Sequence, residues 1–223
     1  IANLLRLQPG ESIASILSVR EFEEDKFVMV ATERGIVKKT SLMAYSKPRQ
    51  GGIIGLTIDK GDRVIGAELC DGESDILLAT EKGFSIRFSE KEVRPIGRTG
   101  RGVRGIRLKK EDRVVGAEIV QPGNKFLTVT SKGYGKRTRM EEYPVQGRGG
   151  LGVMTIRCNE KTGTVVGVQQ VEETDQLLVI TSNGNIVRMR VNEISVIGRN
   201  TQGVRLVGIG EGNHVVSIEK LVE

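Results

Sequence analysis

The sequence predicts an all-β fold made of a recurring unit of about 50 residues. Three observations carry this prediction. A hairpin pattern occurs four times, a second phrase repeats in step with it, and no segment shows a sustained 3.6-residue apolar period with helix caps. The composition agrees, because 29 glycines and only 4% aromatic residues favour many tight turns and a core of Val, Ile and Leu.

The hairpin pattern is an apolar β-branched run, then a polar pair that ends in glycine, then an alternating run. Its copies are FVMVATERGIVKKT (27–40), ILLATEKGFSIRFS (76–89), FLTVTSKGYGKRTR (126–139) and LLVITSNGNIVRMR (177–190). The turn glycines, at spacings of 48, 50 and 51 residues, are Gly35, Gly83, Gly133 and Gly184. Glycine adopts positive φ without strain, so we expect a tight turn at each of these positions.

The second phrase reads DRVIGAELC (62–70), DRVVGAEIV (112–120), GTVVGVQQV (163–171) and NHVVSIEKL (213–221). A fifth copy, ESIASILSV (11–19), has no hairpin before it. Each full unit is expected to hold about four strands: two in the hairpin, one after a Gly-rich stretch and one in the second phrase. Units of this size usually stack radially as propeller blades, and a linear β-solenoid is the less favoured alternative.

We therefore divide the chain, as a single domain, into a half repeat and four full repeats, with the boundaries 1–26, 27–75, 76–125, 126–176 and 177–223. The half repeat and the start at Ile1 indicate a piece of a longer protein. Residues 76–125 carry 12 basic and 6 acidic residues, which equals the whole net charge of +6. A basic excess suits a polyanionic partner, although many other proteins share it.

Basic residues recur at one position of the hairpin, four residues after the turn glycine. This column is Lys39, Arg87, Arg137 and Arg188; Arg139 and Arg190 follow two residues later, and Lys38 and Lys136 precede two of its members. Because side chains alternate along a strand, we expect the column to face solvent while Ile86 and Phe88 face the core. The column fits either phosphate contacts or charges that protect an exposed edge from pairing.

Four Gly-rich stretches lie between each hairpin and the next strand: KPRQGGIIGL (47–56), IGRTGRGVRGIRL (96–108), VQGRGGLGV (145–153) and IGRNTQGVRL (197–206). Glycine lets backbone N–H groups approach a phosphate, and arginine contacts phosphate in a planar, bidentate way. The alternative is a bulge or connecting turn that needs glycine only for φ. The recurrence favours phosphate contact, and the candidate residues in or beside these stretches are Lys47, Arg49, Arg94, Arg98, Arg101, Arg104, Arg148, Arg199 and Arg205.

The residues that are scarce limit the function. Few aromatic side chains are available to stack on bases, which disfavours single strands and RNA and leaves recognition of the duplex DNA backbone. His214 is the only histidine, so metal sites and nucleophiles that depend on histidine lack parts, and we expect no catalysis, cofactor or metal. No apolar stretch approaches 18 residues, and Cys70 and Cys158 form no CxxC motif, so we expect a cytoplasmic chain without a membrane partner.

Several phrases closely resemble the C-terminal domain of the A subunit of bacterial DNA gyrase and, as a near neighbour, that of topoisomerase IV. They are GVRGIRL (102–108), GYGKRT (133–138), EISVIGRNTQGV (193–204) and IGRNTQGVRL (197–206). The resemblance implies a β-pinwheel, which is a propeller-like disc whose neighbouring blades exchange strands. It also implies a basic rim that wraps duplex DNA and so supports negative supercoiling by an ATP-dependent type II topoisomerase.

The same resemblance implies the partners. They are double-stranded DNA, the rest of the gyrase A subunit, and the gyrase B subunit, in a heterotetramer at the bacterial nucleoid. The active-site tyrosine and the ATPase lie outside such a domain. A propeller-like scaffold that binds proteins is the alternative from another class.

One departure from the family concerns its signature heptapeptide QRRGGKG, which belongs to the first blade. The closest string here is QGRGGLG (146–152), where Gly147 replaces an arginine and Leu151 replaces the lysine. Residues 1–19 resemble the tail of the second blade, so we expect the first blade to be absent from this sequence.

Overall fold

A computed structural model describes residues 7, 10–47, 49 and 52–221. Four hairpins form where the sequence predicts them: β1 (Phe27–Thr32) with β2 (Ile36–Ser41), β4 (Asp75–Thr80) with β5 (Phe84–Ser89), β8 (Lys125–Thr130) with β9 (Tyr134–Arg139), and β12 (Gln176–Thr181) with β13 (Ile186–Arg190). Their turn glycines have φ of +79°, +82°, +76° and +82°. The positive φ expected at each turn is confirmed.

The second phrase also forms strands, which are β3 (Val64–Cys70), β7 (Val114–Ile119), β11 (Val165–Val171) and β15 (Val215–Leu221). Each pairs antiparallel with the first strand of its hairpin. The described part of the chain has no α-helix, and its helical turns are the 3₁₀ segments η1 (Leu42–Tyr45), η2 (Glu90–Glu92), η3 (Met140–Glu142) and η4 (Val191–Glu193). The all-β prediction is confirmed.

The remaining strands are two residues long, and each crosses to the preceding hairpin. They are β6 (Val103–Arg104), which pairs with β2, β10 (Val153–Met154), which pairs with β5, and β14 (Val204–Arg205), which pairs with β9. The strand exchange of a β-pinwheel is therefore confirmed. The expected place of the third strand was wrong, because it lies within the Gly-rich stretch and not after it.

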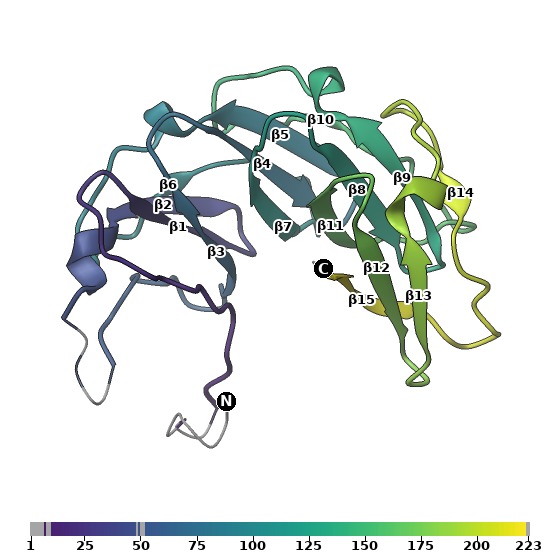
Figure 1. Cartoon of the computed structure of the whole chain (residues 1–223), viewed down its shortest axis with the longest axis horizontal. Helices are drawn as coiled ribbons and strands as arrows, with labels where there is room; N and C mark the ends of the chain where they lie inside the picture. The colour runs from purple at the N-terminus through teal and green to yellow at the C-terminus, as the bar shows by residue number, and fades with distance from the viewer. Residues whose placement is uncertain (1–6, 8–9, 48, 50–51, 222–223) are drawn as a thin grey trace.

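Four sheets result, and we call each a blade. They are numbered first to fourth along this chain, independently of the blade numbering used above for the family signature. From the inside outwards their orders are β3-β1-β2-β6, β7-β4-β5-β10, β11-β8-β9-β14 and β15-β12-β13. Figure 1 shows the blades side by side in an arc, with the strands of the second phrase on the inner side and the exchanged strands towards the outside. The arrangement is radial, so the propeller-like prediction is preferred over a solenoid. Residues 11–19, the fifth copy of the phrase, form no regular strand.

The core lies between the blades. One cluster joins Met29 and Val37 of the first blade to Leu78 and Phe88 of the second, and two further clusters repeat this arrangement along the arc. Neighbouring inner strands also contact one another. An internal sheet is therefore covered on both faces by its neighbours, and this decides where the charged side chains of the hairpins can go.

Candidate nucleic-acid interface

The Gly-rich stretches form the outer side of the arc, and we call residues 52–58, 96–108, 145–157 and 196–206 the rim loops. Each of the last three makes a U-turn around the outer hairpin strand of the preceding blade. The loop first runs parallel to that strand, as Pro95 does beside Lys39, and then returns antiparallel to it, as Arg104 does opposite Ile36. The same pair of contacts recurs at β5 and at β9. Each rim loop thus belongs to one repeat in sequence but pairs with the hairpin of the preceding repeat.

Three rim-loop glycines are required by this close approach. Gly102, Gly152 and Gly203 have φ of +89°, +72° and +76°. A Cβ added to any of them would stand less than 3 Å from a backbone oxygen of the preceding blade. These positions serve the packing of the chain itself, so the alternative explanation of the glycines, a connecting turn, holds for them.

Arginines tie each rim loop to the one before it. The Nη1 atoms of Arg98 and Arg148 donate to the carbonyl oxygens of Ile54 and Arg104, each over 3.1 Å. Arg199 Nη1 donates likewise to Met154 O over 2.9 Å. The three arginines were predicted as DNA contacts, and the structure places each one at a junction between loops, with Arg148 exposed and Arg98 and Arg199 half-buried.

Backbone hydrogen bonds continue the same series. Arg107 N donates to Gly150 O and Arg157 N to Thr201 O, both over 2.8 Å, and Thr57 N donates to Gly100 O over 3.4 Å. The rim loops therefore form one continuous strip. Arg107 and Arg157 are exposed on this strip and were not among the predicted contacts. Alignment on Gly102 and Gly152, instead of on the hairpin turn, would have found them, because each lies five residues later.

Other predicted arginines are exposed with few partners in the protein. Within the described residues, no hydrogen bond or ion pair engages the side chains of four of them, which are Arg94, Arg104, Arg139 and Arg190. Arg101 is exposed and pairs with Asp59 over 3.1 Å. Arg205 on β14 donates to Tyr134 Oη over 3.2 Å, and this contact lowers the pKa of the phenol. Lys47 and Arg49 are exposed in the stretch that precedes the first rim loop.

The basic column of the hairpins does not face solvent in the first three blades, so the predicted orientation was wrong. Lys39 and Arg137 are 3% and 4% exposed. Lys39 Nζ donates to Glu90 O over 2.9 Å and lies 3.4 Å from Glu90 Oε2. Arg137 Nε donates to Ile194 O over 2.7 Å. The partners belong to the next blade, because both faces of an internal blade are covered.

Arg87 in the second blade has partners both in its own hairpin and in the next blade. Its Nε lies 2.8 Å from Asp75 Oδ2, and its Nη1 donates to Met140 O over 3.1 Å. Arg188 alone of the column is exposed, on β13 of the last sheet, where it donates to the side chain of Gln176. The column therefore joins blades, and neither edge protection nor phosphate contact accounts for its buried members.

Lys38 and Lys136 also differ from prediction, because they are 1% and 0% exposed. Lys38 Nζ donates to Gly55 O over 2.7 Å and to Arg98 O. Lys136 Nζ donates to Gly198 O over 2.5 Å and to Thr201 Oγ1 over 3.0 Å. Burial lowers the pKa of both amines, that of Lys136 to about 8. Neither amine contacts solvent directly, and both lie beneath a rim loop.

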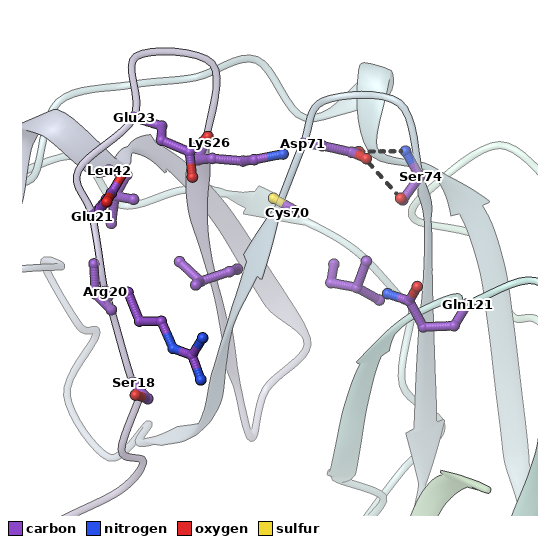
Figure 2. A pocket seen from close by; sticks show the side chains of 13 residues that line it. Ser18, Arg20, Glu21, Glu23, Lys26, Leu42, Cys70, Asp71, Ser74 and Gln121 are labelled. Carbon is purple, nitrogen blue, oxygen red and sulfur yellow. Dashed lines mark hydrogen bonds between the residues drawn. The ribbon is translucent and has the colours of Figure 1, made fainter. Parts of the chain in front are cut away.

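A groove of about 690 Å³ lies between residues 18–26 and the ends of β3 and β7. Figure 2 shows Arg20, Lys26, Glu23 and Asp71 around it, with Asp71 accepting hydrogen bonds from Ser74. Burial raises the pKa of the thiol of Cys70 at its wall. Charges of both signs line this groove, on the inner side of the blades, so it lacks the arginine excess of the rim.

Among the described residues, no group of three or more His, Cys, Asp or Glu side chains is placed to share a metal ion. The same part of the chain holds no helix long and apolar enough to cross a membrane.

Comparison with known proteins follows the repeat. The family described as DNA gyrase C-terminal domain, beta-propeller, matches residues 26–71, 74–121, 124–172 and 175–221. The DNA gyrase A subunit of Buchnera aphidicola is 56% identical over the whole chain, and those of Salmonella typhimurium and Escherichia coli K12 are 47% and 44% identical. The chain spans only 25–27% of the length of these relatives.

The fold is shared with solved structures, among them the following two. The C-terminal domain of DNA topoisomerase IV superposes with a TM-score of 0.92 at 25% identity, over 99% of this chain and 69% of that one. The C-terminal domain of DNA gyrase A superposes with a TM-score of 0.88 at 24% identity, over 99% of this chain and 74% of that one.

Proposed function

Because the chain belongs to the family of DNA gyrase C-terminal domains, we propose that it binds duplex DNA along the rim loops and bends it around the arc. The proposed contacts are the exposed basic residues Lys47, Arg49, Arg94, Arg101, Arg104, Arg139, Arg148, Arg190 and Arg205, with the half-buried Arg98 and Arg199 at the loop junctions. Arg107 and Arg157 are added to them. The buried Lys39 and Arg137 are left out of this surface, as is Arg87, which is half-buried and bonded to Asp75 and Met140.

The continuity of the rim is the observation that supports bending. Three loop junctions repeat the same arginine-to-carbonyl bond, so the exposed arginines lie along one curved strip and not in isolated patches. Bending about 40 base pairs through a half turn costs roughly 10 kcal/mol for a persistence length of about 150 base pairs. Contacts distributed along several loops can offset that cost, because each neutralised phosphate releases counterions.

Within the longer protein, we propose that this bent DNA serves negative supercoiling by gyrase. The partners would be the rest of the gyrase A subunit, and the gyrase B subunit, in the bacterial cytoplasm at the nucleoid. We assign gyrase and not topoisomerase IV because the relatives from Buchnera aphidicola, Salmonella typhimurium and Escherichia coli, at 44–56% identity, are gyrase A subunits. Strand cleavage and ATP hydrolysis are assigned to the other parts of that assembly.

Binding is tested by fluorescence anisotropy with a labelled 40-base-pair duplex of arbitrary sequence. We expect the logarithm of the association constant to fall with the logarithm of salt concentration, with a slope of about −0.9 per phosphate contact. Six or more contacts would cost about a thousandfold in affinity between roughly 50 and 200 mM salt. A flat salt response would contradict the proposal and favour the protein-binding scaffold.

Bending is tested separately with donor and acceptor dyes on the two ends of the duplex. Energy transfer should rise on binding, because the ends approach as the duplex follows the rim. Binding without a change in transfer would leave a DNA-binding chain that does not bend its ligand.

A further inference from the structure

Two buried lysines occupy the inside of rim-loop U-turns. Lys136 Nζ reaches three oxygens of the fourth rim loop, which are Gly198 O, Arg199 O and Thr201 Oγ1. Lys38 Nζ reaches Arg98 O of the second rim loop and Gly55 O of the first. A tight U-turn directs carbonyl oxygens inward, and an ammonium group supplies donors to several of them at once. The lysines therefore hold loop carbonyls away from the outer surface.

The basic residues that follow these lysines in the hairpin strands form ion pairs. Lys39 and Arg137 are paired with the carboxylates of Glu90 and Glu173 at 3.4 and 2.8 Å. Lys38 and Lys136 donate only to neutral oxygens, and no carboxylate of the described chain lies within ion-pair distance of either. Neither ammonium group is therefore part of an ion pair.

The surroundings of Lys136 support this difference. Burial is the largest influence on its pKa and lowers it, the carboxylate of Glu142 raises it, and the guanidinium of Arg199 lowers it further. For Lys38, burial and Arg98 act in the same downward direction on the pKa. A cation that is kept in a dry site, beneath a loop rich in arginine, is stabilised by an anion on the outer side of that loop.

A comparison within the chain shows that the fold does not require lysine here. The equivalent residue of the second blade is Ile86, which is fully buried beneath the third rim loop. Its side chain lies beside Gly150 of that loop. An apolar side chain can therefore fill this position, so packing alone does not explain the lysines at 38 and 136.

We propose that Lys38 and Lys136 are positioning residues for duplex DNA. Each holds the carbonyl oxygens of a rim loop inward, so that the arginines of the loop face the phosphates, and each adds a positive charge that no ion pair engages beneath them. The ligand class is the phosphate backbone of a duplex. This inference rests on the proposed function of the rim.

The test is Lys136→Ile, which places at this position the residue that occurs naturally at 86. We expect affinity for the 40-base-pair duplex to fall about fivefold to tenfold at 100 mM salt, and the log–log salt slope to become shallower by about one contact. The matched control is Thr128→Val. Thr128 is buried directly opposite Lys136 on β8 and its hydroxyl has no partner, so this variant should bind DNA as the wild type does.

A pH profile separates positioning from a purely structural role. As pH rises from 7 to 9 at constant ionic strength, the wild type should lose affinity, because Lys136 with its pKa of about 8 gives up its proton. Lys136→Ile should lose less over the same range. If Lys136→Ile does not fold, as judged by circular dichroism, Lys136→Met and Lys38→Ile are used in its place. The pH profile of the wild type tests the proposal without any variant.

The outcomes distinguish the two proposals. A wild-type chain that does not bind duplex DNA would overturn the proposed function itself. Steep, salt-dependent binding by the wild type that is unchanged in folded Lys136→Ile and Lys38→Ile, or unchanged between pH 7 and 9, would overturn only the positioning role.

Discussion

Arg137 and Glu173 form an ion pair of 2.8 Å at the junction between the third and fourth blades. Arg137 is 4% exposed, and it also donates to the carbonyl oxygens of Asn192, within η4, and of Ile194, which directly follows it. Glu173 remains half-exposed, and its hydrogen bonds to Lys125 and Arg137 lower its pKa to about 2. A residue chosen from the sequence as a DNA contact is therefore a joint between blades.

Removal of this joint should destabilise the protein. Arg137→Ala leaves buried carbonyl oxygens without donors, at about 1–3 kcal/mol each, so we expect a loss of roughly 2–4 kcal/mol in the free energy of unfolding. Arg188→Ala, at the same repeat position in an exposed strand, should change it by about 0.5 kcal/mol or less. Urea denaturation measures both, and equal losses would show that the bonds between blades do not set the cost.

The exchanged strands should carry DNA contacts. Arg104 and Arg205 occupy equivalent positions on β6 and β14, where the middle loop has Met154. Arg104→Ala with Arg205→Ala should make the salt slope of duplex binding shallower by about 2 units and weaken binding at all sequences alike. Arg63→Ala is the control. Arg63 is exposed beside the inner strand β3, at the opposite edge of the sheet from β6, and it forms an ion pair with Glu33. A similar loss in this control would mean that only total charge matters.

Leu151 offers a gain of function in the third rim loop. It is half-exposed, and it stands where the second loop has Arg101 and the fourth has Gln202. Leu151→Lys should raise duplex affinity about threefold to tenfold at 100 mM salt by adding one phosphate contact. Leu151→Gln controls for the removal of the apolar side chain. An increase that persists at about 1 M salt would not be electrostatic.

The rim-loop glycines can be tested through stability. Gly203→Ala introduces a Cβ less than 3 Å from Gly135 O at a φ of +76°, so it should displace β14 and cost about 2 kcal/mol or more. Gly97→Ala meets open space at an ordinary φ and should be nearly neutral. Thermal unfolding compares the two variants. A neutral Gly203→Ala would show that the exchanged strand tolerates displacement.

Stability should also depend on pH through two carboxyl groups of the inner strands. Glu68 accepts a hydrogen bond from Ile119 N over 2.9 Å, and Glu118 accepts one from Gln170 Nε2 over 3.2 Å. Burial raises the pKa of both groups above the ordinary carboxyl range. The folded state then holds protons that the unfolded state releases. The stabilisation from these two carboxyl groups is therefore complete below their pKa in the unfolded chain, and it is lost as pH rises through their pKa in the folded chain.

We therefore expect the free energy of unfolding to decline from pH 5 to 8 by on the order of 2 kcal/mol, which appears as a lower urea midpoint. Glu68→Gln keeps the shape of the side chain and cannot titrate, so its decline should be smaller. A midpoint that rises over this range in the wild type, or an unchanged slope in the variant, would assign the titration elsewhere.

The elements that the sequence predicts well are local. Each hairpin needs only an apolar run, a turn glycine such as Gly35 or Gly133, and an alternating run, all within 14 residues. The exchanged strands β6, β10 and β14 are two residues long and pair with a distant segment, so no local pattern marks them. The repeat pattern predicted a third strand in each unit but misplaced it, and its exchange between blades was implied only by the family resemblance.

The candidate site divides in the same way. The rim loops and their exposed arginines, such as Arg104 and Arg205, were predicted as candidates from glycine and arginine content, because solvated loops can carry charge without burying it. The hairpin column was misjudged, because alternation tells which residues share a face but not what covers that face. In an internal blade the covering element is another sheet, about 50 residues away in sequence.

The repeat, the hairpins, the turn glycines and the basic excess can all be read from the amino-acid sequence. All of these depend on the conformational preferences of a residue and its near neighbours. Which basic residues stay exposed depends instead on how the repeats pack together. Lys136 and Arg137 become buried beneath the loop and blade that follow, whereas Arg139, two residues later, stays exposed. The physical reason is that the free energy of a charged side chain depends on the surface packed against it, and that surface comes from the next repeat.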